Sequence, residues 1–162
     1  VLDDGTVIPE SDTIVEYLAD AYPEAKLRPA KPADIARGRL IARVAELYVM
    51  AAGSALFGQM NPAARDAAVV DDAFVKLESG LEHLNVFMTE DTYAVGDSLT
   101  TADCALVPML MFVGVFGMVF RKGDLLAKHT EVAAYWSRVQ QEPGAAKVLA
   151  EMQAALAARR AG

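Results

Sequence analysis

The sequence is poor in residues that crosslink a chain or bind metal ions. It has one cysteine, Cys104, and two histidines, His83 and His129, among 162 residues. A single thiol cannot form an internal disulfide, and these scattered positions lack the clustered spacing of a structural zinc site. No secretory signal pattern is present either, so we expect a cytoplasmic protein that holds no metal.

Basic residues are outnumbered, with 15 lysines and arginines against 22 aspartates and glutamates, for a net charge of −7. This balance argues against nucleic acid or an anionic membrane as a partner. An uncharged run from Cys104 to Phe120 is shorter than the about 20 apolar residues of a membrane span, and it contains Pro108 and two glycines. We therefore favour a helix buried on all sides in a soluble bundle over a transmembrane helix.

Strand-like sequence is confined to residues 1–8. The Asp-Gly pair that ends at Gly5 predicts a β-hairpin there, because it supplies the positive φ of a tight turn. A helix is predicted from Ser11 to about Ala21, and two prolines indicate a linker over residues 28–33. A hairpin with one helix is at best marginally stable alone. We therefore expect residues 1–27 to be the C-terminal end of a larger sheet domain.

Residues 34–162 show only helical periodicity and predict an all-α domain. The predicted helices are a long one from Asp34 toward Gly58, one beginning near Pro62, an apolar one from Thr101 to Phe120, and two shorter ones at the end. Arginines 37, 39 and 43 with Glu46 are assigned to a solvated face, with a dimer contact as the alternative.

The segment "GDSLTTAD", Gly96 to Asp103, is typical of a helix start. Thr100 at the N-cap and Asp103 three residues later predict a capping box, in which each residue binds the other's backbone N–H. Leu99 and Cys104 occupy the flanking apolar positions. Cys104 is therefore interpreted as a small buried apolar residue in preference to a nucleophile.

The motifs "ESDTIVEYL", "VGDSLTTADCALVPML" and "VAAYWSRVQQEPGAAKVL" occur here in the order seen in glutathione transferases. The resemblance covers essentially the whole chain. It implies a mainly α fold: a glutathione-transferase-like C-terminal helical bundle in residues 34–162, preceded by a β-hairpin and helix remnant of a thioredoxin-like α/β domain in residues 1–27. It also implies a cytoplasmic homodimer that takes part in detoxification.

The same resemblance implies that Glu10 and Ser11 bind the γ-glutamyl end of glutathione, the co-substrate. A helix N-terminus offers free N–H groups and a positive dipole end to its carboxylate, Ser11 adds a hydroxyl, and Glu10 suits the ammonium group. The alternative is that Ser11 only caps its helix and Glu10 only favours the dipole.

The family also implies an electrophile pocket, for which Tyr48, Phe112 and Phe116 are the candidates. Aromatic residues at helical spacing are more often core residues. The catalytic Tyr, Ser or Cys of the family is expected upstream of Val1, so no catalytic residue is named. The implied function is transfer of the glutathione thiolate to a hydrophobic electrophile; the alternative is a non-catalytic binding or interaction module of the same fold.

Overall fold

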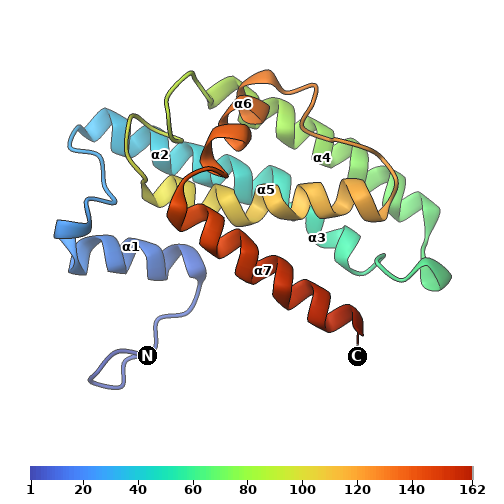
Figure 1. Ribbon diagram of the computed structural model, residues 1–162, viewed down its shortest axis with the longest axis horizontal. Coiled ribbons are helices and arrows are strands. Elements are labelled where there is room, and N and C mark those ends of the chain that lie inside the picture. The colour runs from blue at the N-terminus through green and yellow to red at the C-terminus, as the bar shows by residue number, and fades with distance from the viewer. Residues whose placement is uncertain (162) are drawn as a thin grey trace.

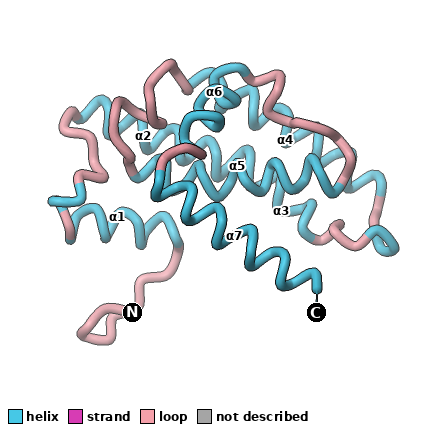
Figure 2. Tube along the Cα trace, in the orientation of Figure 1, coloured by secondary structure: helices cyan, strands magenta, loops and turns pink. Residues whose placement is uncertain are grey.

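A computed structural model describes residues 1–161, and within this range every regular element is helical (Figures 1 and 2). The α-helices are α1 (Ser11–Ala21), α2 (Pro32–Val44), α3 (Ala51–Phe57), α4 (Ala67–Phe87), α5 (Thr101–Val119), α6 (Thr130–Val139) and α7 (Pro143–Ala161). Two 3₁₀ turns, η1 (Pro23–Ala25) and η3 (Pro62–Ala64), and one π-helical segment, η2 (Ala45–Met50), complete the fold.

The predicted β-hairpin is wrong, because no strand forms among the described residues. The tight turn itself is present: Gly5 has φ +87°, its N–H donates to the Leu2 carbonyl at 3.0 Å, and the Leu2 N–H donates to the Thr6 carbonyl at 2.8 Å. The flanking residues Val1 and Val7 are exposed. Since a lone two-stranded hairpin has no sheet to pack on, the turn forms without a ladder.

Helix α5 is the central element of the bundle. Figure 1 shows it crossing the middle of the molecule, and it contacts α1, α2, η2, α3, α6 and α7. Most of its apolar side chains meet a neighbouring element, but Gly114 and Met118 are exposed, so the prediction of a helix buried on all sides holds only in part. The fully buried core combines this helix with α2 to α4 and α6, through Ile41, Val49, Leu56, Leu77, Leu81, Leu84, Leu106, Leu110, Val113, Phe116, Val132 and Tyr135.

Helices α2, η2 and α3 form one continuous rod, residues 32–57, which packs against α4 and α5. This rod and α5 are both long and apolar enough to cross a membrane by composition, with 39% and 50% of their most apolar windows buried inside the fold. Core helices of soluble proteins have the same composition, so two such helices are weak evidence for a membrane span.

Two helix starts differ from the predicted ones. Helix α2 begins at Pro32, so Asp34 lies in its first turn and does not cap it. Pro62 opens the short turn η3, and α4 begins only at Ala67, where the Asp66 carboxylate accepts the N–H of Ala68 at 2.8 Å. Pro32 and Pro62 both lie in the first turn of a helix, where the backbone N–H is not needed. A proline in the sequence marks such a first turn, but it does not show whether a long helix or a short 3₁₀ turn follows.

The Asp103 carboxylate joins three segments of the bundle. It is fully buried and accepts hydrogen bonds from the Thr100 N–H at 2.8 Å, the Thr100 hydroxyl at 2.8 Å, the Ala94 N–H at 2.9 Å and the Tyr135 hydroxyl at 3.0 Å. Thr100 and Asp103 have the arrangement of a capping box, in which the Asp103 carboxylate accepts the Thr100 N–H and the Asp103 N–H donates to the Thr100 carbonyl at 3.1 Å. Asp103 therefore caps α5 and also fixes the loop before it and helix α6.

Helix α1 is attached to the bundle by polar contacts. The Glu16 carboxylate pairs with Arg28 at 2.9 Å and with Arg39 of α2 at 3.0 Å. The Leu27 carbonyl accepts the Thr101 N–H at 3.0 Å, which satisfies one of the free donors at the start of α5. The connection between α1 and α2 is thus held against the bundle. The predicted domain division at residues 28–33 stays a prediction.

The other side of α1 is apolar and uncovered. Ile14, Tyr17 and Leu18 are 40%, 38% and 41% exposed, although their helical spacing is that of a buried face. Within the described residues, this face of α1 therefore stays partly open to solvent.

Candidate functional site

A cavity of about 510 Å³ lies between the N-terminus of α1, the α2–η2 rod and α5. Glu10 and Ser11, the residues predicted to bind glutathione, form its α1 side together with the first turn of that helix. The opposite walls come from one face of α2–η2 and from the first two turns of α5. The structure therefore brings the two predicted residues next to η2 and α5, the elements that carry the three residues predicted for an electrophile pocket.

Glu10 has a strained backbone, with φ +68° and ψ +123°. A residue with a side chain rarely adopts a positive φ, and such strain is concentrated at binding and catalytic sites. Glu10 is the N-cap residue of α1, but its side chain makes no capping hydrogen bond. The glutamate side chain is thus not occupied in holding the helix end.

Ser11 is the first residue of α1 and not its N-cap. The hydroxyl is exposed at the helix N-terminus, where the first N–H groups of a helix have no partner within the helix. This position does not support the alternative in which Ser11 serves only as a cap. Together with the positive end of the helix dipole, it is suited to bind a carboxylate.

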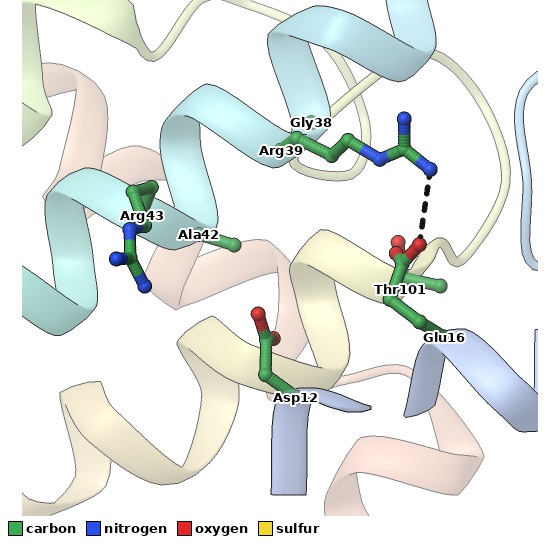
Figure 3. Close-up of a pocket in the computed structure, with 7 residues that line it drawn as sticks. All are labelled: Asp12, Glu16, Gly38, Arg39, Ala42, Arg43 and Thr101. Atoms are coloured by element: carbon green, nitrogen blue, oxygen red, sulfur yellow. Dashed lines mark hydrogen bonds and ion pairs between the residues drawn. The ribbon is translucent and has the colours of Figure 1, made fainter. Parts of the chain in front are cut away.

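Arg43 and Glu46 lie on the α2–η2 wall of this cavity and form an ion pair, Nη1 to Oε2, of 2.7 Å. Their side chains are 61% and 49% exposed. Arg43 also lines an adjoining hollow of about 330 Å³, drawn in Figure 3, where Asp12 points up from α1 and Arg43 points down from α2. The Arg39–Glu16 ion pair closes the other side of that hollow.

The assignment of all these arginines to a solvated face is therefore incomplete. Arg43 and Glu46 are accessible to water but belong to a cavity wall. Arg39 binds α1, and Arg37 binds the Asp91 carboxylate at 2.8 Å and the Thr89 hydroxyl at 2.6 Å.

The rest of the cavity is apolar. Met50 of η2 faces Cys104, Ala105, Pro108 and Met109 of α5. Cys104 is only partly buried and lines the cavity, so it is less enclosed than its flanking position at the helix start predicted. Burial, together with the neighbouring Asp103 charge, raises the pKa of its thiol. The thiol therefore stays protonated near neutral pH and is a poor nucleophile.

The π-helical segment η2 contributes Glu46 and Met50 to the cavity. Its wide turn packs against α4, where Gly80 allows a close approach: a Cβ at this position would lie 2.6 Å from the Tyr48 carbonyl oxygen. Short π-helical segments are frequent at functional sites. In this fold the segment lies between the cavity on one side and α4 on the other.

The three aromatic candidates do not gather around this cavity. Phe116 is fully buried in the core, and Phe112 packs beside it, with ring centroids 6.5 Å apart. Tyr48 is 51% exposed, stacks edge-on against His83 at 5.5 Å, and lines a different hollow against α4. Their assignment to an electrophile pocket gains no support from this geometry.

Comparison with known protein families shows which family this chain belongs to. Residues 46–143, more than half of the chain, match the family described as "Glutathione S-transferase, C-terminal domain". The chain belongs to the glutathione S-transferase family. The matched range starts inside η2 and ends at the first residue of α7.

Solved structures of glutathione S-transferases share the fold. One from Methylobacterium radiotolerans, in complex with glutathione sulfonate, superposes with a TM-score of 0.72 at 23% identity over 91% of this chain and 68% of its own. A sphingomonad glutathione S-transferase complexed with glutathione has a TM-score of 0.72 at 24% identity, covering 93% of this chain and 70% of its own.

A curated relative is the probable maleylacetoacetate isomerase of Caenorhabditis elegans, 29% identical over 119 residues, or 71% of this chain. The match covers 55% of that protein, so the present chain spans about half the length of this relative.

Sequence reasoning missed the cavity walls. Arg43, Glu46 and Met50 have the spacing of one helix face, and so do the α5 residues that begin at Cys104. Periodicity could have grouped each set. It could not have shown that the two faces meet in front of Glu10 and Ser11, because that depends on how α1 docks.

Proposed function

We propose that this chain contributes the γ-glutamyl contact and the electrophile-binding wall of a glutathione transferase. One observation carries the proposal: Glu10 and Ser11 open into the same cavity as the apolar face of α5. In this arrangement a glutathione held at the start of α1 would lie beside a second, apolar molecule held by the helical bundle.

The first part of the site fits the γ-glutamyl end of glutathione. The γ-glutamyl carboxylate would accept hydrogen bonds from the free N–H groups at the start of α1 and from the Ser11 hydroxyl. The ammonium group would pair with the carboxylate of Glu10, a residue that lines the cavity and whose side chain does not cap α1. Glutathione S-transferases with glutathione bound support this reading through the shared fold.

The second part of the site fits an apolar electrophile. Met50, Pro108 and Met109 offer a surface without charge, and methionine side chains adapt to ligands of different shape. Holding the thiolate and the electrophile side by side lowers the entropic barrier to their reaction. We place the group that activates the thiol outside this cavity, since Cys104, the thiol that lines it, has a raised pKa and Tyr135 is buried in the core.

We further propose a cytoplasmic homodimer. Exposed apolar residues along the outer side of α2 and η2, namely Leu40, Leu47 and Tyr48, support a contact with a second subunit. Sedimentation of the intact protein tests this assembly.

Calorimetric titration of the intact protein with glutathione tests the binding function. We expect binding that Ser11→Ala weakens about tenfold, because a hydrogen bond to a charged group is lost. Ser54→Ala is the matched control, since this exposed hydroxyl of α3 donates to the Met50 carbonyl one turn earlier in the same rod and does not line the cavity. No binding of glutathione by the unaltered protein would refute the proposal.

Turnover of 1-chloro-2,4-dinitrobenzene by the intact protein tests the catalytic function separately. Conjugation is expected. Binding of glutathione without turnover of this or other electrophiles would favour the non-catalytic binding module over the enzyme.

A further inference from the structure

The cavity between α1, the α2–η2 rod and α5 carries an uneven set of charges. Among the described residues that line it, Arg43 is the one cation, and it shares the cavity with three acidic residues, Glu10, Asp12 and Glu46. In the proposed function Glu10 binds the ammonium group of glutathione, and Glu46 is already paired with Arg43. Arg43 is therefore the group that an anionic part of the second ligand would meet.

The geometry of Arg43 favours recognition of a carboxylate. A guanidinium carries five N–H donors in a plane, and the Glu46 carboxylate approaches one nitrogen, Nη1, at 2.7 Å. Glu46 is three residues further along the same continuous rod, so the pair favours a guanidinium position at the cavity wall. The remaining donors are free to bind a carboxylate in the paired manner typical of arginine.

Arg43 lies in the same cavity as the apolar wall. It stands on α2, and it lines the same cavity as Met50 of η2 and Pro108 and Met109 of α5. A ligand whose ring or alkyl body lies against these three apolar residues would present a substituent to Arg43. The carboxylates of the same cavity disfavour every added negative charge, and only the position next to Arg43 offsets this repulsion, so the wall accommodates at most one carboxylate.

We propose that Arg43 makes this site select electrophiles that carry a single carboxylate on an apolar body. This inference rests on the proposed function, because it takes the cavity to be the electrophile site. It names a substrate class and a specificity-determining residue.

The test compares two pairs of ligands on the intact protein. The reaction pair is 4-chloro-3-nitrobenzoate and uncharged 1-chloro-2,4-dinitrobenzene, compared by kcat/KM. The binding pair is the corresponding glutathione conjugates, S-(4-carboxy-2-nitrophenyl)glutathione and S-(2,4-dinitrophenyl)glutathione, compared by calorimetry. The measured quantity in each case is the preference for the carboxylate ligand over the neutral one.

Arg43→Gln is expected to lower this preference about fivefold, a modest value because the side chain is more than half exposed. Arg43→Lys should retain part of the preference, since the charge stays but the planar fork is lost. Lys147→Gln on the exposed surface of α7 removes the same unit of charge and should leave the preference for the carboxylate ligand unchanged. Thermal melts of each variant check that the fold is intact.

An unchanged preference in Arg43→Gln would overturn the inference while leaving the transferase function in place. Conjugates that bind without any turnover would refute catalysis, yet the binding ratio would still decide the role of Arg43. Absence of binding by both conjugates would overturn both proposals.

Discussion

Replacing Asp103 with alanine should strongly destabilise the helical bundle. The carboxylate is fully buried and accepts four hydrogen bonds, from two backbone N–H groups and two hydroxyls. Alanine leaves the N–H groups of Ala94 and Thr100 and the hydroxyls of Thr100 and Tyr135 without this acceptor. A buried donor that loses its partner costs about 1–3 kcal/mol, so we expect a loss of about 4 kcal/mol.

Such a loss is a large part of the about 5–15 kcal/mol that typically stabilises a folded domain. Tyr135→Phe removes one donor only and should cost about 2 kcal/mol, since its partner is charged. Burial and the adjacent Asp103 charge raise the pKa of Tyr135, so the phenol remains a donor throughout the accessible pH range. Thr100→Ala should cost about 1 kcal/mol through the weakened cap.

Urea denaturation, followed by far-ultraviolet circular dichroism and by the fluorescence of the single tryptophan, Trp136, measures these values. The double variants Asp103→Ala/Tyr135→Phe and Asp103→Ala/Thr100→Ala should be clearly less destabilised than the sum of the single variants, because each pair removes a shared contact. A cost below about 1 kcal/mol for Asp103→Ala, or additivity in both cycles, would refute the reasoning.

Other parts of the structure give three more expected outcomes. Gly80→Ala should destabilise the protein by about 2 kcal/mol, because the new Cβ would meet the Tyr48 carbonyl. Gly114→Ala should stabilise α5 by up to about 1 kcal/mol, because a Cβ there has nothing within 4 Å. Thermal melts compare the two variants, and equal effects would contradict the packing argument. Glu10→Gly should raise the free energy of unfolding by about 1 kcal/mol, because glycine relieves the positive φ, and it should weaken glutathione binding. A loss of stability would show that the Glu10 backbone is not strained. The Gly96 N–H and the Arg37 guanidinium lower the pKa of Asp91. Asp91→Asn should therefore cost about 1 kcal/mol or less of unfolding free energy at neutral pH, and this cost should vanish as the pH falls through the lowered pKa. A stability difference that does not change with pH in urea titrations would exclude this linkage.

Local patterns in the sequence were enough to define most helices. The helix Ser11–Ala21 was predicted with both ends as observed, because its apolar spacing and Pro23 are local signals. The capping pair Thr100 and Asp103 and the all-round apolar helix after it are also encoded within a few residues. The hairpin prediction failed because a turn is local whereas a strand needs a neighbouring strand, and none is present in the described chain.

The candidate site required the tertiary structure. The sequence motif around Glu10 and Ser11 indicated a glutathione contact, but the strained φ of Glu10 and the position of Ser11 inside the helix are set by how the chain enters α1. The aromatic residues chosen from helical spacing divided between the core and another face, since spacing defines a face of a helix but not what that face meets. Arg43, Glu46, Met50 and Met109 came together only because α1, α2 and α5 converge, and such contacts between distant segments are decided by packing of the whole bundle.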